Sequence, residues 1–173
     1  MILRQCPIDL RLYILLCSDL ALRSGSAVRV APCHRVDGTV RLDHVKHGKN
    51  IALPVTAEIA AIFDMVETNP NCDRQMSYLE ALRVTSTTRR AVAKSLANHY
   101  TNRLKHVCGK LGIENLRTHD FRRTTAERVY TETRDLRLVQ ALLGHSHLNI
   151  TSRYLMREQM KPSLQLLEKV KSA

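Results

Sequence analysis

Several features that would assign a protein to a class at once are missing from this sequence. No apolar run comes near the roughly 18 residues that a membrane span needs, so we expect no membrane association. The start has arginines among its apolar residues and no small-residue cleavage site, so we expect no signal peptide. Repeats, low-complexity stretches and long linkers are also missing. A chain of 173 residues with 44% hydrophobic and 25% charged residues is therefore expected to form one globular domain.

Cysteine pairs of the C-x-x-C type are missing too, which removes the usual signature of a zinc ribbon or a redox site. The five cysteines, an odd number, stand at positions 6, 17, 33, 72 and 108. A metal cluster of Cys33 and His34 with His44 and His47 would lack the usual spacing of ligands. We therefore expect no metal site, and buried, reduced thiols of a cytoplasmic protein.

Acidic residues are few. The chain has 16 of them against 27 lysines and arginines, which gives a net charge of +11. Residues 1–87 contain ten basic and nine acidic side chains, whereas residues 88–173 contain seventeen and seven, so the second half holds nearly all of the surplus. Such a field favours a polyanion as partner, although ribosomal and membrane-surface proteins are as basic. Charge alone leaves the partner open.

The hydrophobic pattern predicts mostly helices. Leucines at 12, 15, 16 and 20 predict an opening helix, which residues 24–26 interrupt before a second helical piece ends near residue 31. Further helices are predicted from Thr56 to about residue 68, from about 88 to 111, from 117 or 118 onward, between Asp135 and Gly144, and over about 149–156. A tail helix is predicted within 157–173.

A small antiparallel sheet is predicted between residues 33 and 55. Asp37-Gly38 is a hairpin signal, because both residue types tolerate a positive φ. Hydrophobic and polar residues alternate around Val40, and they alternate again around Leu53 after a turn at residues 47–48. The expected fold class is α+β and mainly helical.

Four side chains suited to phosphate chemistry gather within 36 residues of the basic half. His119 and Arg122 share one face of a predicted helix. His145 follows Gly144 just past a helix end, which is expected to turn it out of the core, and Tyr154 lies nine residues beyond. Arginines hold anionic oxygens without losing their proton. A phenol, whose usual pKa is about 10, becomes a nucleophile when its proton is removed.

Taken singly, each of these residues has a purely structural explanation. Arg122 could belong to a solvated basic face, and His119 could cap its helix. His145 could be a loop residue beside a C-cap glycine, and Tyr154 could be a half-buried core tyrosine. The order and spacing of the whole set nevertheless favour a catalytic constellation.

Five segments, in order, resemble the tyrosine recombinase family of phage integrases and Xer-like proteins. They are ALRS (21–24), VKHGKNIALP (45–54), THDFRRT (118–124), LLGHS (142–146) and RY (153–154). The family carries H-x-x-R, L-L-G-H and a tyrosine nine residues after the second histidine, and the spacing is the same in this sequence. The resemblance covers about residues 10–160. It implies the fold of the tyrosine recombinase catalytic domain.

The resemblance also implies a role for each matching residue. Tyr154 would attack the scissile phosphate, form a 3′-phosphotyrosyl link and free a 5′-hydroxyl. Arg23 and Arg122 would hold the non-bridging oxygens. His119 would assist proton transfer at the tyrosine, and His145 would contact the phosphate or support the pocket.

The hairpin would present Lys46 to protonate the departing 5′-oxygen, with Lys49 as a rival because turn alignments slip. The family often has an acidic residue that braces the first arginine, and Ser26 stands in that place. Neither a cofactor, ATP nor a metal is implied, since the phosphotyrosyl bond conserves the energy.

By this resemblance, residues 1–173 are the catalytic domain of a site-specific DNA recombinase, without the family's N-terminal DNA-clamping domain. Its implied partners are double-stranded DNA and further copies of the chain, assembled as a tetrameric synapse through the C-terminal tail. The implied location is cytoplasmic, on DNA. Two alternatives stay open: a type IB topoisomerase or telomere resolvase with the same chemistry, and a truncated, non-catalytic DNA-binding remnant.

Overall fold

The computed structural model describes residues 3, 6–45, 49–70, 72–82 and 93–155. Its elements in chain order are α1 (Ile8–Ser18), α2 (Ser24–Ala27), the short 3-10 helix η2 (Pro32–His34), β1 (Arg35–Val36), β2 (Thr39–Val45), β3 (Lys49–Pro54), α3 (Ala57–Glu67), α4 (Tyr78–Ala81), α5 (Ala93–Lys110), α6 (Thr118–Thr133) and α7 (Leu136–Leu143). Residues 148–155 are also helical. The predicted α+β, mainly helical fold with a small antiparallel sheet is confirmed. The predicted tail helix lies outside the described residues.

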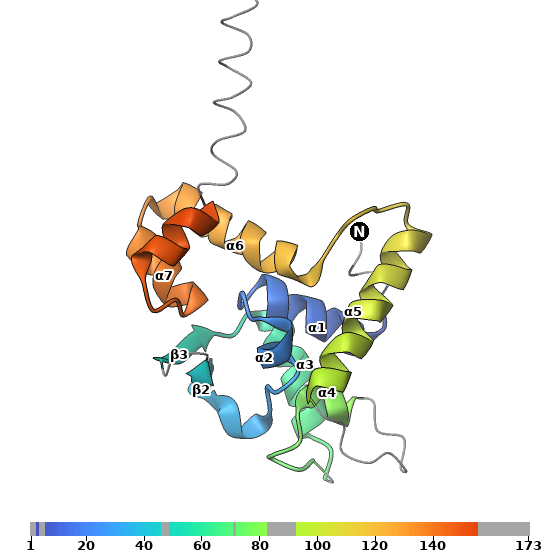
Figure 1. Cartoon of the computed structure of the whole chain (residues 1–173). Helices are drawn as coiled ribbons and strands as arrows, with labels where there is room; N and C mark the ends of the chain where they lie inside the picture. Colours follow the sequence, from blue (N-terminus) through green and yellow to red (C-terminus); the bar gives the residue numbers. More distant parts are fainter. Residues whose placement is uncertain (1–2, 4–5, 46–48, 71, 83–92, 156–173) are drawn as a thin grey trace, which may run out of the picture.

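Helix α1 is the centre of the main core. It packs against α3, α4, α5 and α6, and Figure 1 shows these helices around it. Leucines on one face were the basis for predicting this helix, but Tyr13 and Ile14 on its other faces are buried as well. A helix that is apolar on every side is typically covered on every side.

The break after α1 lies earlier than the sequence predicts. Residues 24–26, expected to interrupt the helix, form the short helix α2, and the chain turns at residues 19–23 instead. Ala21 carries this turn with a φ of 48°, in the left-handed region that residues with a Cβ rarely adopt. A glycine in a helix costs only about 1 kcal/mol, so Gly25 does not prevent a single helical turn.

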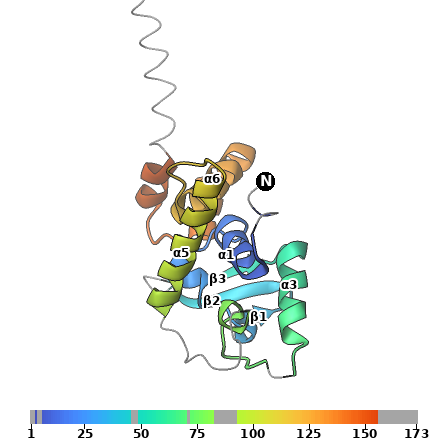
Figure 2. The same cartoon turned by 90° about the vertical axis from the view of Figure 1, so that its right-hand side faces the viewer.

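The sheet has three antiparallel strands in the order β1-β2-β3. As predicted, Asp37 and Gly38 form the first turn, with φ values of 48° and 69°. Val36 pairs with Thr39 across it. In Figure 2 the sheet lies beneath α1, with α3 beside it.

Several helix ends agree with the sequence in position. Asp135 caps α7 by accepting hydrogen bonds from the backbone N–H groups of Arg137 and Leu138, and Gly144 ends that helix with a φ of 57°. Thr56 stands at the N-cap of α3, but its side chain makes no capping bond. Its hydroxyl donates to Asp19 at 3.2 Å. Helix α4 was not predicted.

A second, smaller core joins α6, α7 and the helix 148–155. Its buried members are Ala21, Ala126, Val139, Leu143 and Leu155. Figure 1 shows this group at the far end of α6 from α5. The candidate catalytic residues lie where the two cores meet, so their relative positions depend on both.

The prediction of buried thiols is correct for Cys17 and Cys108, and it is wrong for Cys33, which is exposed. Cys33 lies in the surface turn η2, where the chain enters the sheet. Among the described helices, none is both long and apolar enough to cross a membrane.

Candidate active site

Arg122 occupies the centre of the site. It lies in the first half of α6 and is only 2% exposed. One terminal nitrogen donates to the carbonyl of Ala21, and the other donates to the carbonyl of Leu143 at 2.6 Å. The guanidinium therefore joins the turn after α1 to the end of α7. Arg122 therefore does not belong to a solvated basic face, which was the alternative, structural explanation for this residue.

Arg23 brings a second positive charge toward Arg122. It stands half-buried at the N-cap of α2, and its Nη1 atom is buried without a hydrogen-bond partner, as is the Nε atom of Arg122. Burial and the charge of Arg23 together lower the pKa of Arg122 to about 10. No ion pair to either arginine forms within the described part of the chain, and Ser26 supplies none.

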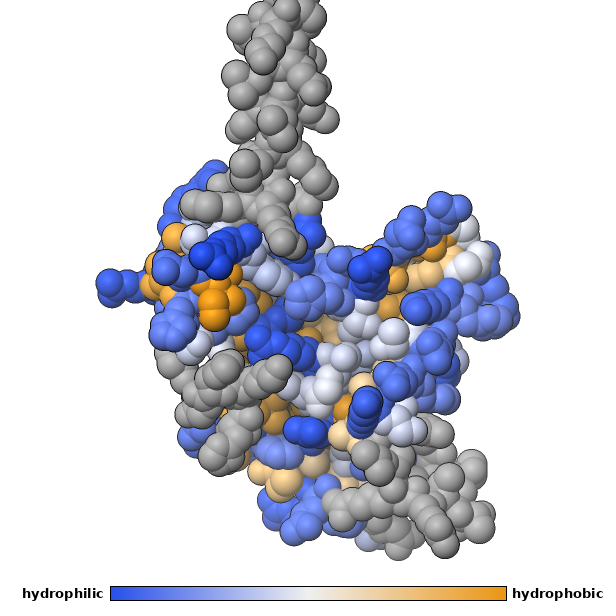
Figure 3. All heavy atoms as spheres, in the orientation of Figure 1, coloured by the Kyte–Doolittle hydropathy of each residue, from blue (hydrophilic) through white to orange (hydrophobic). Residues whose placement is uncertain are grey.

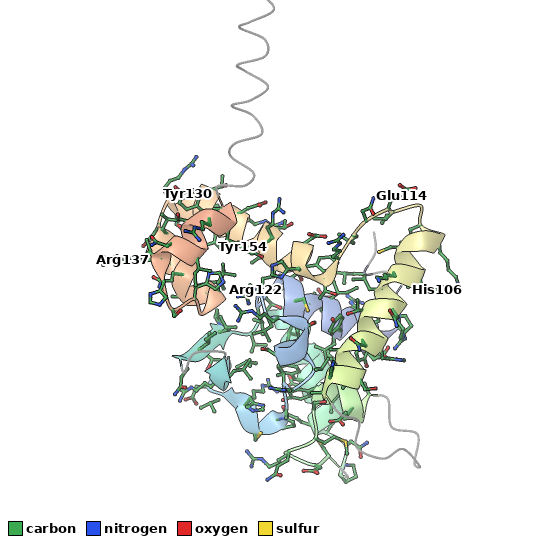
Figure 4. The ribbon with its side chains drawn as sticks, viewed as in Figure 1. His106, Glu114, Arg122, Tyr130, Arg137 and Tyr154 are labelled. Atoms are coloured by element: carbon green, nitrogen blue, oxygen red, sulfur yellow. The ribbon has the colours of Figure 1, made fainter. Side chains whose placement is uncertain are left out.

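Tyr154 points into the same region from the helix 148–155. Its ring meets His119 edge to face, with centroids 5.4 Å apart, and meets His145 in the same manner at 5.9 Å. Figure 4 shows Tyr154 and Arg122 close together between α7 and the α1–α2 turn. The Tyr154 hydroxyl is buried without a hydrogen-bond partner.

The electrostatics of Tyr154 follow from this position. Burial raises the pKa of the phenol, and the charges of Arg122 and Arg123 oppose that rise. The hydroxyl and the Arg122 guanidinium are near enough to affect each other's pKa, but their geometry is not that of a hydrogen bond. The phenol is therefore neutral at ordinary pH and needs a base to become a nucleophile.

His145 is buried, at 6% exposure, and the expectation that Gly144 turns it out of the core is wrong. Its backbone N–H donates to the Gln140 carbonyl at 3.1 Å, and the Gln140 side chain donates back to the His145 carbonyl at 2.9 Å. The left-handed Gly144 thus folds His145 back under α7. Burial, followed by the charges of Arg122 and Arg23, lowers the pKa of His145 to about 4, so its imidazole is neutral.

His119 lies in the first turn of α6 and is exposed. It does not cap the helix, since the Asp120 carboxylate accepts the Arg117 N–H at 2.7 Å. Although the residue is exposed as a whole, its ring is partly desolvated, and this, followed by the nearby charge of Arg122, lowers the pKa of His119. A neutral imidazole that faces a phenol is suited to accept the phenolic proton.

The structure thus brings together Arg23, His119, Arg122, His145 and Tyr154. Lys46 lies outside the described residues, so its assignment stays a prediction, and the rival Lys49 begins strand β3. Among the described residues, no group of three or more histidine, cysteine, aspartate or glutamate side chains is placed to hold a metal ion.

Two residues of the site, Thr151 and Gln140, were not singled out by the sequence analysis. Thr151, which is 0% exposed, lies 3.0 Å from Nδ1 of His145 through its hydroxyl oxygen, and Gln140 holds the backbone of His145 on both sides. The one available signal for Thr151 was its place one helical turn before Tyr154. Nothing in the sequence pointed to Gln140.

The arrangement as a whole is suited to hold an anion. Two arginines with unpaired buried nitrogens and two neutral histidines lie around Tyr154, a half-buried residue whose hydroxyl is buried. A pocket of about 400 Å³ adjoins His145 between β3 and α7. On the face drawn in Figure 3, exposed hydrophobic surface lies over the α7 region, where Leu138 is 47% exposed. Over the other coloured parts of this face blue, hydrophilic residues predominate, with white and orange atoms among them.

The fold and the grouping of these residues define a catalytic domain of the tyrosine recombinase type. Residues 3–160 match the sequence pattern of the phage integrase family, and the chain belongs to that family. Among curated proteins no sequence match was found.

Solved structures with this fold are distant in sequence. XerA recombinase is 18% identical, with a TM-score of 0.66 over 94% of this chain and 60% of its own. XerH recombinase bound to difH substrate is 20% identical, with a TM-score of 0.64 over 88% of this chain and 46% of its own. The catalytic domain of bacteriophage HP1 integrase is 20% identical, with a TM-score of 0.57 over 88% of this chain and 80% of its own. The chain thus spans about half to three fifths of the two Xer proteins.

Proposed function

We propose that this chain is the catalytic domain of a site-specific DNA recombinase that cleaves and rejoins DNA through a 3′-phosphotyrosyl intermediate. The observation that carries the proposal is the pair of positive charges of the buried Arg122 and the half-buried Arg23, each with a buried nitrogen that has no hydrogen-bond partner, near the unpaired hydroxyl of Tyr154. Buried charges in proteins are normally paired. A phosphodiester would supply the missing negative charge and the electrophile together.

In this mechanism the Tyr154 oxygen attacks phosphorus, and the bond from phosphorus to the 5′-oxygen breaks. The phenolic proton passes to His119, and the departing 5′-oxygen takes a proton from Lys46, or from Lys49 if the turn places that residue there. Arg23 and Arg122 stabilise the charge that builds on the non-bridging oxygens, which is worth roughly 3–4 kcal/mol for one such donor. Attack of a 5′-hydroxyl on the phosphotyrosine reverses the step and rejoins the strand.

The proposed partners follow from the same reaction. Recombination needs two DNA sites held together, and solved structures with this fold include a lambda integrase tetramer bound to a Holliday junction. We therefore propose double-stranded DNA and further copies of this chain as partners, with the C-terminal tail joining the copies. A location on DNA in the cytoplasm rests on this function alone.

The test is covalent trapping on a pool of nicked duplexes of random sequence, in which cleavage releases a short strand and stalls rejoining. We expect an adduct that survives denaturation, with Tyr154 recovered as the modified residue after proteolysis. DNA binding without an adduct would overturn the proposal in favour of a non-catalytic remnant. Relaxation of supercoiled plasmid by single copies of the chain would favour a topoisomerase.

A further inference from the structure

The hydroxyl of Thr151 and the ring of His145 form a buried pair within the candidate site. The Thr151 oxygen lies 3.0 Å from Nδ1 of His145, with Thr151 completely buried and His145 nearly so. Among the described residues this nitrogen is the one hydrogen-bond partner that Thr151 has. A buried hydroxyl without an acceptor for its proton is costly, so we expect the hydroxyl to donate to Nδ1.

The direction of this bond decides the form of the imidazole. A neutral histidine carries its proton on one nitrogen, so an Nδ1 that accepts leaves the proton on Nε2. The Nε2–H group can then donate to an anionic oxygen. With the other tautomer, Nε2 would present a lone pair to that oxygen, and the contact would be repulsive.

The hydrogen bond between Thr151 and His145 also holds the helix that carries Tyr154. Thr151 and Tyr154 are three residues apart on the helix 148–155, so their side chains lie on one face of it. The rings of His145 and Tyr154 meet at 5.9 Å. Because Gln140 holds the backbone of His145 to α7, the Thr151 hydroxyl ties the helix that carries Tyr154 to a fixed point.

We propose that Thr151 is a positioning residue, which fixes the proton of His145 on Nε2 and holds the Tyr154 helix against His145. Its effect on catalysis rests on the proposed recombinase function, whereas its effect on the tautomer does not. Thr151→Val removes the hydroxyl and keeps the shape, and Thr151→Ser keeps the hydroxyl.

The first measurement is the tautomer of His145 in the DNA-free chain, read from long-range proton–nitrogen spectra of the ¹⁵N-labelled protein near pH 7.5. Loss of signals in His145→Gln assigns the resonances. We expect the proton on Nε2 in the unmodified chain and in Thr151→Ser, and a mixture of the two tautomers in Thr151→Val. A proton on Nδ1 in the unmodified chain, or an unchanged tautomer in Thr151→Val, would overturn the proposal.

The second measurement is the single-turnover cleavage rate on a nicked duplex recovered from the random pool. We expect Thr151→Val to be slower by roughly tenfold or more, as loss of one hydrogen bond allows, with unchanged DNA affinity. Thr151→Ser should recover most of the rate. A matched control is Thr125→Val, which removes a helix hydroxyl that donates to the Ser18 carbonyl away from His145.

The two measurements separate the possible failures. If Thr151→Val cleaves as fast as the unmodified chain, or if Thr125→Val loses the same rate, Thr151 has no positioning role. A different result is no adduct from the unmodified chain, together with a His145 proton that sits on Nε2 in the unmodified chain and in Thr151→Ser but not fully in Thr151→Val. In that case the recombinase function fails and the positioning role of Thr151 stands.

Discussion

The rings of His119 and Tyr154 meet edge to face, with 5.4 Å between their centroids and 88° between their planes. His119 comes from the start of α6, and Tyr154 comes from the helix 148–155. The pKa of the histidine is lowered by burial and by Arg122, whereas burial raises the pKa of the tyrosine. A neutral imidazole and a protonated phenol thus lie side by side, without a hydrogen bond between them. For His119 to accept the phenolic proton during attack, the Tyr154 hydroxyl must come within hydrogen-bond reach of a ring nitrogen.

Tyr154→Phe should abolish the covalent adduct while DNA affinity stays nearly unchanged. The substitution removes one oxygen and keeps the ring that packs between the histidines. Because that oxygen is buried without a partner, we expect the free energy of unfolding to stay equal or to rise by about 1 kcal/mol. Urea unfolding and the denaturing-gel assay measure both effects. A gel-stable adduct in this variant would mean that another residue is the nucleophile.

Arg122→Lys should lose cleavage by about a hundredfold or more, although it keeps a positive charge. Lysine has no planar fork, so it cannot donate to the carbonyls of Ala21 and Leu143 while it holds a phosphate. We expect the free energy of unfolding to fall by about 2 kcal/mol, because two buried acceptors lose their donor.

The matched control for Arg122→Lys is Arg123→Lys. Arg123 is the next residue of α6, and it forms an i,i+4 ion pair with Glu127 at 2.9 Å near the surface. Such exposed pairs contribute about 1 kcal/mol or less. The cleavage rate and the free energy of unfolding should therefore change little in Arg123→Lys. Equal losses in the two variants would mean that the guanidinium of Arg122 is no more important than that of its neighbour.

DNA affinity should depend steeply on salt, because residues 88–173 carry seventeen basic and seven acidic side chains. If five of these cations contact phosphates, the logarithm of the binding constant should fall against the logarithm of salt concentration with a slope of roughly −4.5. Titrations of a fluorescent duplex between low and moderate salt give this slope. A slope near zero would mean that the basic half does not form the DNA surface.

Much of the architecture could be predicted from the sequence because the deciding signals are local. Asp37-Gly38 fixes a turn through the φ values that it tolerates, and Asp135 and Gly144 fix the two ends of α7. The order and spacing of the family motifs likewise identified five residues that the structure brings together.

The burial of the site could not be predicted in the same way. Whether Arg122 faces solvent or the core depends on carbonyls 101 and 21 residues away in the chain. The position of His145 depends on the hydrogen bonds that Gln140 makes to its backbone. The contact between the Thr151 hydroxyl and the His145 ring depends in turn on that position. These contacts join residues that are far apart in the sequence, or involve three residues at once, and neither hydrophobic periodicity nor a short motif predicts them.

Deleting residues 162–173 should remove cooperative assembly on paired DNA sites while single-site cleavage persists. The sequence places three leucines, Leu164, Leu166 and Leu167, after Pro162 in the predicted tail helix, and these positions lie outside the described residues. Band-shift assays with one and with two sites measure the cooperativity. Replacing the three leucines with serine in the full-length chain should have the same effect. Unchanged cooperativity in both variants would mean that the tail packs within its own chain.

Acid should destabilise the chain through His145. Its pKa is near 4 in the folded state and near 6.5 when unfolded, so between these values the unfolded chain binds the extra proton. The contribution of His145 to the free energy of unfolding is therefore fully present above about pH 6.5. It declines as the pH falls toward 4, by up to about 3 kcal/mol. The exposed His119 shifts in the same direction and adds to the trend.

The measurement for this last prediction is urea unfolding of the unmodified chain and of His145→Gln at pH 7.5 and at pH 4.5. The glutamine cannot take up a proton, so the loss of stability between the two values should be smaller in the variant by about 2 kcal/mol or more. Groups that titrate elsewhere change both chains alike and cancel in the comparison. An equal loss in the two chains would show that His145 titrates near its usual pKa in the folded state, and that its ring is not buried beside the arginines.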